Sequence, residues 1–347
     1  MRTSTVHSFW ESAAGDPAGS LIQARDGLLY GTTRFSGVNI GGTVFQLQPD
    51  GSVTILHQFD GTTEGMRPAA GVLQGSDGAF YGTTSQGGPL DAGTVFRMAG
   101  DGSVTVLHAF NGPAEGAGSV APLIQARDGS FYGTTFTGGS ANLGTVFRLT
   151  PAGSFSVVHT FTGADGANPS AALTETADGT LHGVTQRGGA NGRGAVFKLT
   201  ASGAFTLVHS FTGADGERPT RALVQGDDGY LYGTAERGGP SGGGVVFRLV
   251  DVSCEDTLTV GYAGGTLNIT FHIRSVVPST WSAWLVARNQ VFPIWSVPVP
   301  AVTPAVSFAV PVANFPHLGS IGVLTTLANP SVGAVCGDWK TIDTGLR

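Results

Sequence analysis

The stretch "LIQARDGLLYGTT" at residues 21–33 opens a unit that occurs five times along the chain. The later copies read "VLQGSDGAFYGTT" at 72–84, "LIQARDGSFYGTT" at 123–135, "LTETADGTLHGVT" at 173–185 and "LVQGDDGYLYGTA" at 223–235. Their shared aspartates, spaced by 51, 51, 50 and 50 residues, are Asp26, Asp77, Asp128, Asp178 and Asp228. A regular period of about 40–50 residues is typical of β-propeller blades. The sequence therefore predicts an all-β repeat.

Each unit contains four strand-like runs separated by turns. In the first copy these runs are Leu21–Ala24, Leu28–Thr33, Thr43–Gln48 and Ser52–Phe59. An Asp-Gly pair joins the first two runs and a second glycine turn joins the last two, because glycine tolerates the positive φ of such turns. Four antiparallel strands with short links form one propeller blade.

The two ends of the array predict how the ring closes. The fifth copy stops after its third run, "GVVFRL" at 244–249, while "TVHSFW" at 5–10 matches the fourth run of the other copies. A strand at Val6–Phe9 completing the fifth blade would remove both free sheet edges. We therefore expect residues 1–250 to form a five-bladed β-propeller closed by an N-terminal strand.

The period ends near Asp251, where the composition changes. Residues 251–347 hold four of the five tryptophans and about seven short strand-like runs, which predicts a β-sandwich of immunoglobulin-like size. Cys254 and Cys336 lie 82 residues apart, which favours a disulfide within this domain over a metal site. Such a bridge would stabilise the domain by about 4–5 kcal/mol and implies an oxidising compartment.

Composition excludes several classes of function. Of 347 residues only 12% are charged, the net charge is −6, and no block of like charge occurs, so a nucleic-acid partner is not expected. No apolar run is long enough for a membrane helix or a signal peptide. We expect an exported protein, extracellular or on the cell surface, whose signal peptide is absent from this chain.

The pattern "DGxxYGTT…GTVFxL…VxxLHxF" closely resembles the GloVer tandem repeats of bacterial choice-of-anchor proteins, over residues 5–250. The resemblance implies export, surface association and a variable C-terminal region, and it supplies no catalytic motif. The sequence departs from the pattern mainly in the fourth and fifth copies, where His182 replaces tyrosine and Ala235 replaces threonine. Those copies are where a specialised site is expected.

Two repeated residue types are predicted to be structural. The histidines at 7, 57, 108, 159 and 209 fall on outer strands of different blades, too far apart to share one metal ion. We expect each to hydrogen-bond to its own turn or to the next blade. The repeated turn aspartates supply too few oxygens for calcium and are expected to cap their turns. No metal and no cofactor is predicted.

The connections between second and third strands are expected to share a face with those linking successive blades. Residues on that face with ligand-binding chemistry are Arg34, Gln186, Arg187, Glu236 and Arg237. Arginine beside amide and carboxylate groups holds sugars or acidic ligands through bidentate hydrogen bonds. Solvated loop charges are the alternative interpretation.

Catalysis has weaker support. Glycoside cleavage needs two carboxyl groups, and Glu236 has no partner carboxylate at the same level in the other copies. His182 with Glu236 is the one acid–base pair considered for a catalytic site.

Three functions follow. The first is a non-enzymatic, glycan-binding or adhesive propeller, with the C-terminal domain for attachment or assembly. The second is a polysaccharide hydrolase or lyase with its site in the fourth and fifth blades. The third is a structural subunit that forms a homo-oligomer through the C-terminal domain.

Overall fold

The chain divides into two compact units, Met1–Arg248 and Leu249–Arg347. The structure, a computed structural model, describes residues 5–9, 15–37, 40–227 and 229–249, and in the C-terminal unit the strands at 257–263, 266–272, 279–287, 290–299, 306–311, 320–329 and 334–343.

The first unit consists of five small antiparallel sheets, called blades 1 to 5 here. Their strands, in chain order, are β1 (Pro17–Gln23), β2 (Leu29–Thr33), β3 (Thr43–Leu47) and β4 (Val53–Gln58); β5 (Leu73–Gln74), β6 (Phe80–Thr83), β7 (Thr94–Met98) and β8 (Val104–Ala109); β9 (Ile124–Gln125), β10 (Phe131–Thr135), β11 (Thr145–Leu149) and β12 (Phe155–Thr160); β13 (Thr174–Glu175), β14 (Leu181–Thr185), β15 (Ala195–Leu199) and β16 (Phe205–Ser210); and β17 (Glu217–Pro219), β18 (Val224–Gln225), β19 (Leu231–Arg237) and β20 (Val245–Leu249).

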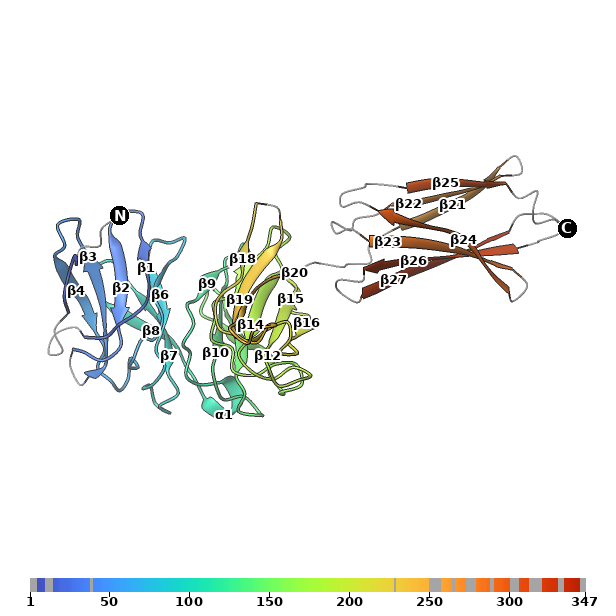
Figure 1. The fold of residues 1–347 in the computed structure, drawn as a ribbon. Helices are drawn as coiled ribbons and strands as arrows, with labels where there is room; N and C mark the ends of the chain where they lie inside the picture. Colours follow the sequence, from blue (N-terminus) through green and yellow to red (C-terminus); the bar gives the residue numbers. More distant parts are fainter. Residues whose placement is uncertain are drawn as a thin grey trace. The chain divides into compact units, whose positions relative to one another are not determined.

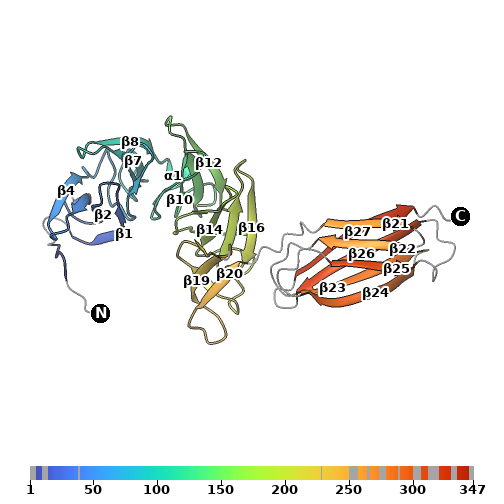
Figure 2. The same cartoon turned by 90° about the horizontal axis from the view of Figure 1, so that it is seen from above.

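The order of strands follows the chain in blades 1 to 4, as the repeat predicts, but not in blade 5. Blades 1 to 4 have the four-strand order of a meander, and blade 5 has the order β17-β19-β18 with β20 paired to β19. A single helical turn, α1 (Gly112–Glu115), lies between β8 and β9. Within this unit the blades follow one another along an arc (Figures 1 and 2). The all-β, propeller-like repeat is confirmed.

The glycine of each "YG" pair packs against the phenylalanine of the following "VF" pair. A Cβ atom on Gly82 would lie 2.5 Å from Cζ of Phe96, and one on Gly133 would lie 2.5 Å from Cζ of Phe147. The phenylalanine of each third strand therefore lies directly over the glycine of the second strand. Any side chain at that glycine would displace a fully buried ring.

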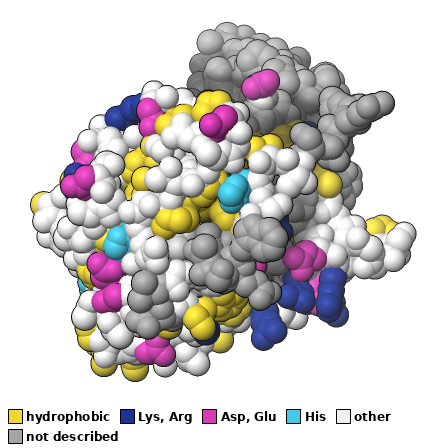
Figure 3. Space-filling model, turned by 90° about the vertical axis from the view of Figure 1, so that its left-hand side faces the viewer, with side chains coloured by type: hydrophobic (Ala, Val, Ile, Leu, Met, Phe, Trp, Pro, Cys, Tyr) yellow, Lys and Arg dark blue, Asp and Glu magenta, His cyan; other side chains and the backbone are white. Residues whose placement is uncertain are grey.

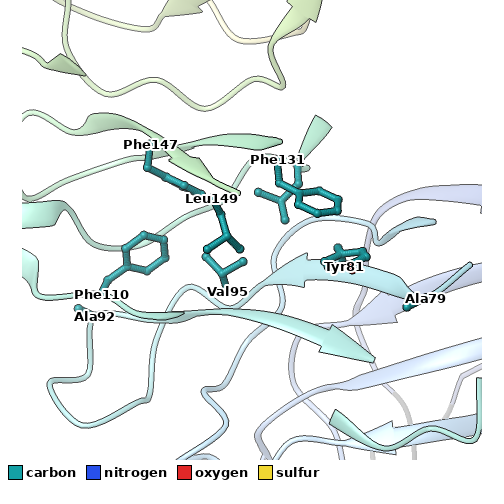
Figure 4. Packing of buried hydrophobic residues seen from close by; sticks show 9 residues of the cluster. Ala79, Tyr81, Ala92, Val95, Phe110, Phe131, Phe147 and Leu149 are labelled. Atoms are coloured by element: carbon teal, nitrogen blue, oxygen red, sulfur yellow. The ribbon is translucent and has the colours of Figure 1, made fainter. Parts of the chain in front are cut away.

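The core lies between neighbouring blades. Figure 4 shows side chains of blades 2 and 3 pointing toward one another. Tyr81 stacks on Phe131 with 4.0 Å between ring centroids. Phe110, which follows the fourth strand of blade 2, packs edge-on against Phe147 of blade 3 at 5.2 Å. Burial of such rings supplies about 1.5–3 kcal/mol each, so the blades depend on their neighbours for stability.

The two ends of the array differ from its middle. Val95, Val146 and Val196 are fully buried, whereas the equivalent Val246 of β20 is 77% exposed. Leu21 of blade 1 is 48% exposed, and its counterparts in the other blades are 2–4% exposed. In the described residues no strand pairing joins blade 5 to blade 1.

The N-terminal segment does not form the predicted closing strand. Residues 5–9 have no strand conformation, and Trp10 lies outside the described residues. Phe9 nevertheless packs on Phe45 at 5.0 Å, the contact that Phe59 makes with Phe96. The segment thus contacts blade 1 as a preceding fourth strand would, without the hydrogen bonds to β20 that would make it a strand.

The second unit contains two antiparallel sheets in its described part. One has the order β21 (Thr257–Ala263), β22 (Thr266–His272), β25 (Val306–Pro311); the other has the order β24 (Gln290–Val299), β23 (Ser279–Ala287), β26 (Ser320–Asn329), β27 (Ala334–Asp343). β21 contacts β27. Cys336 belongs to β27, but Cys254 lies outside the described residues, so the disulfide is not supported by the structure and stays a prediction.

Candidate functional site

The turns between first and second strands are held by their aspartates. Oδ1 of Asp128 accepts a hydrogen bond from the amide of Ser130 at 2.8 Å, and Oδ2 accepts bonds from Tyr132 Oη at 3.2 Å and Arg148 Nη2 at 2.9 Å. Asp77 binds Tyr81 and Arg97 in the same way. The predicted capping role is confirmed for these turns; Asp228 lies outside the described residues.

These hydrogen bonds stabilise the charged form of the carboxylates. The hydroxyl of Thr176, followed by the amide of Thr180, lowers the pKa of Asp178 to about 2. Burial alone would raise the pKa of Asp128, but the amide and hydroxyl of Ser130 and the Arg148 guanidinium hold it below its ordinary value. We call the side formed by these turns, and by the turns between third and fourth strands, the turn face.

The histidines of the fourth strands are also paired. Nε2 of His57 lies 2.9 Å from Glu64, and Nε2 of His108 lies 2.9 Å from Glu115, each in the connector that follows its own strand. Nδ1 of His57 lies 3.2 Å from the carbonyl oxygen of Gly102 in the next blade. Both predicted kinds of hydrogen bond are thus present. In the part of the chain that the structure describes, no three His, Cys, Asp or Glu side chains group as metal ligands.

The opposite side, the loop face, is formed by the loops between second and third strands and by the connectors between blades. Backbone bridges join the two kinds of segment: Met66 with Gln86, Ala117 with Thr137, and Ala167 with Arg187. The connector before blade 5 extends this pattern into a short strand, β17, which pairs with β19. The expected sharing of one face is therefore observed.

Four of the five predicted ligand-binding residues lie in neighbouring blades. Gln186 and Arg187 follow β14, while Glu236 and Arg237 end β19. Gln186 Nε2 donates to Ser170 Oγ at 2.7 Å, and Thr220 Oγ1 donates to Glu236 Oε1 at the same distance. The two polar groups are held in equivalent ways, and both arginines are exposed.

Arg218 lies within this group. It belongs to β17, whose register with β19 puts it opposite Glu236, and its amide donates to the carbonyl oxygen of Arg193 in blade 4 at 2.9 Å. Its Nε is buried and makes no hydrogen bond within the described part. We call these five residues, Gln186, Arg187, Arg218, Glu236 and Arg237, the blade 4–5 cluster.

Arg34 is separate from that cluster. It follows β2 in blade 1, and its amide donates to the carbonyl oxygen of Asp16 at 2.9 Å. Phe35, beside it, is 39% exposed and was not predicted as a site residue. The sequence signal that could have found Phe35 is its residue type. It is aromatic, whereas the equivalent residues of the other copies are Gln86, Thr137, Arg187 and Arg237.

The structure does not bring the alternative catalytic pair together. His182 lies in β14 opposite Lys198, and its equivalent in the fifth copy of the repeat is Tyr232. Glu236 is four residues beyond Tyr232, about 13 Å along the strand at ~3.3 Å per residue. The distance between the two blades adds to this separation. The side chains of His182 and Glu236 are therefore too far apart for direct proton transfer.

A shallow cavity of about 280 Å³ lies between blades 3 and 4 on the turn face. Tyr132 and Arg148 line it on one side and the turn at Thr200–Gly203 on the other. Arg148 is already paired with Asp128 there.

Comparison with known proteins gives one match at the level of a family. A family model described as the Gloeobacter/Verrucomicrobia repeat matches residues 1–126 and 68–265, which together span most of the chain. No curated protein matches. In the described residues no helix is long and apolar enough to cross a membrane.

Solved structures of similar fold are distant. PorZ, a surface component of the type-IX secretion system of Porphyromonas gingivalis, is 12% identical with a TM-score of 0.48; the match covers 96% of this chain, which spans only 47% of PorZ. A polysaccharide lyase acting on ulvan is 10% identical, with a TM-score of 0.44 and coverages of 97% and 95%. A mutant of AofleA from Arthrobotrys oligospora is 10% identical, with a TM-score of 0.39 and coverages of 87% and 92%. Because every TM-score is below 0.5, none of these defines the function of this chain.

Proposed function

The chain belongs to the Gloeobacter/Verrucomicrobia repeat family, and from this premise we propose that it is an exported, non-enzymatic protein whose loop face binds a glycan. The protein acts outside the cell or on its surface. The C-terminal unit serves for attachment or assembly. No metal, cofactor or nucleic acid takes part.

The observation that carries this proposal is the blade 4–5 cluster. Glu236 accepts a hydrogen bond from the Thr220 hydroxyl and Gln186 donates one to the Ser170 hydroxyl, so both are oriented, and exposed arginines follow them in the sequence. Sugar hydroxyls are both donors and acceptors, so such a mixed set of charged and amide groups suits them. On the turn face, by contrast, the carboxylate of Asp128 is used within the fold, because it accepts hydrogen bonds from Ser130 and Arg148.

A glycan array followed by calorimetry tests the proposal. Glu236→Gln keeps the size of the side chain and removes its charge, Arg237→Gln removes the charge and shortens the side chain, and each should weaken binding by about tenfold. Asp50→Asn, on the turn face, is the matched control and should leave the affinity unchanged. An array that stays blank at high protein concentration contradicts the proposed function.

The proposal includes closure of the propeller ring by residues 5–9. Phe9 already makes the contact of a fourth-strand phenylalanine, and Leu21 and Val246 are the residues that closure would cover. Both would leave water as blade 5 packs on blade 1, a gain of about 1–2 kcal/mol for each side chain because both are already partly buried.

Hydrogen exchange at β20 tests closure. If residues 5–9 pair with β20, alternate amides within Val245–Leu249 are slow to exchange in the full chain and fast in a chain lacking residues 1–9. Equally fast exchange in both chains contradicts closure.

Self-association is the second candidate, favoured by the same exposed residues. A blade-to-blade interface joins unlike surfaces, so blade 5 of one copy fits blade 1 of another and builds an open filament. Light scattering on the full chain and on 1–250 separates the cases: a monomer in both supports the closed ring, and a dilution-sensitive polymer in both supports head-to-tail assembly. An oligomer of the full chain alone assigns assembly to the predicted C-terminal sandwich.

A further inference from the structure

Arginine is distributed unevenly over the first unit. Arg97, Arg148 and Arg193 form ion pairs with carboxylates. The arginines of the loop face that make no ion pair with a described residue are Arg34, Arg67, Arg187, Arg218, Arg221 and Arg237. These six guanidinium groups are therefore not paired with a carboxylate of the described residues, although the loop face also carries acidic side chains such as Glu64 and Glu236. On the surface in Figure 3, most visible Lys and Arg side chains gather in one area.

Two of these arginines lie against one aromatic ring. The guanidinium carbon of Arg67 is 5.0 Å from the ring centroid of Phe35, and that of Arg34 is 5.9 Å away. Both distances are within the range of cation–π contacts. Phe35 remains 39% exposed, so the ring also offers apolar surface to a ligand. The three residues form what we call the blade 1 clamp.

The arginine stems of the clamp are fixed. Nε of Arg34 and Nε of Arg67 are buried, and neither donates a hydrogen bond within the described part. Leaving a buried N–H unpaired costs about 1–3 kcal/mol. Side chains held in place lose less entropy when their remaining N–H groups bind an anion.

The backbone at Arg67 is unfavourable for arginine. Its φ is 57°, in the left-handed region, where a residue with a Cβ is disfavoured by about 1–2 kcal/mol. The equivalent residues of the later connectors are Gly118 and Asn168, the types that tolerate this conformation best, and Arg218, which has a φ of 59°. The fold therefore does not need arginine here, which points to a role for the side chain.

We propose that the blade 1 clamp binds the acidic group of a sugar residue, a carboxylate or a sulfate, with Phe35 contacting the sugar ring. Two guanidinium groups match the oxygens of either group through paired hydrogen bonds. This inference rests on the proposed glycan-binding function and adds the ligand class, an acidic polysaccharide. It also adds a subsite in blade 1 to the cluster in blades 4 and 5.

The test compares three probes with the full chain by calorimetry: an oligogalacturonate hexamer, a sulfated oligosaccharide of equal length, and neutral maltohexaose. The variants take their residues from the chain's own repeats, so that each new residue is one the fold already accepts. They are Arg67→Asn (as Asn168), Arg34→Ser (as Ser85) and Phe35→Thr (as Thr137). Arg97→Gln (as Gln46), on the turn face, is the control.

The proposal predicts that an acidic probe binds more tightly than maltohexaose, that Arg67→Asn and Arg34→Ser each weaken it at least about tenfold, and that Arg97→Gln changes it less than about twofold. The tighter of the two acidic probes identifies the acidic group. Equal binding of acidic and neutral probes overturns the clamp while the glycan function stands. Acidic binding that survives Arg67→Asn and Arg34→Ser but is lost in Arg237→Gln moves the site to blades 4 and 5 and overturns the clamp. No binding by any probe overturns both proposals.

Discussion

The turn face and the loop face are built from the same five repeats, yet the repeated aspartates of the turn face and the blade 1 arginines of the loop face use their charges in opposite ways. On the turn face, Asp77 and Asp128 each bind a backbone amide, a tyrosine and an arginine. On the loop face, Arg34 and Arg67 make no ion pair with any described residue.

This difference distinguishes charged groups that stabilise the fold from charged groups that are available to bind a ligand. A group whose partners all lie within the fold gains little from a ligand, because binding would have to replace existing hydrogen bonds. A fixed but unpaired arginine has nothing to replace. The repeated turn aspartates are accordingly part of the scaffold, whereas the loop face combines scaffold pairs such as His57–Glu64 with arginines that make no ion pair among the described residues.

The largest effect is expected on the turn face. Asp128→Ala removes the acceptor of three hydrogen bonds, and we expect it to lower the free energy of unfolding by about 1–2 kcal/mol. Urea denaturation measures this loss, and oligosaccharide binding should be unaffected. If the variant kept its stability but lost binding, the two faces would have exchanged roles.

A smaller effect is expected from acid. The folded pKa of Asp178, about 2, lies below its unfolded value, so its contribution to stability is complete above about pH 4 and is lost as the pH falls toward 2. Because Asp178 is exposed, this contribution is about 1 kcal/mol or less. Urea midpoints between pH 6 and pH 2.5 should fall less steeply for Asp178→Asn than for the parent chain. Parallel curves would mean that the turn hydrogen bonds do not favour the charged carboxylate.

The smallest effect on stability is expected at Arg67, where a substitution should stabilise the fold rather than destabilise it. Arg67→Gly relieves the left-handed backbone and loses a cation–π contact of about 0.5–1 kcal/mol, so stability should stay the same or rise by up to about 1 kcal/mol. Thermal unfolding, which shifts by about 2–4 °C per kcal/mol in a unit of this size, detects the change. A loss above about 1 kcal/mol would assign Arg67 to the scaffold and remove the contrast between the faces.

Much of the fold was predictable from the period. The four strands of the first copy were predicted within a few residues, because glycine turns and alternating apolar residues are local features. The first strand was predicted too short, since Pro17–Ser20 belong to the connector and no apolar pattern marks them. The three-residue β17 was missed for the same reason.

The ends and the sites were less predictable. The sequence of residues 5–9 matches a fourth strand, but strand formation depends on a partner edge that no local pattern contains. Gln186 and Glu236 were found because they interrupt the repeat, whereas their hydrogen bonds to Ser170 and Thr220 depend on how the connectors fold back. Phe35 was missed because exposure of a phenylalanine cannot be told from its type.

The claim that the loop face is the binding face is tested most directly by hydroxyl-radical footprinting with the oligogalacturonate hexamer. Phe35 reports on the loop face, and Tyr230, which follows the turn of blade 5, reports on the turn face. We predict that saturating hexamer slows oxidation of Phe35 several-fold and leaves Tyr230 unchanged. Protection of Tyr230 with unchanged oxidation of Phe35 would contradict the account.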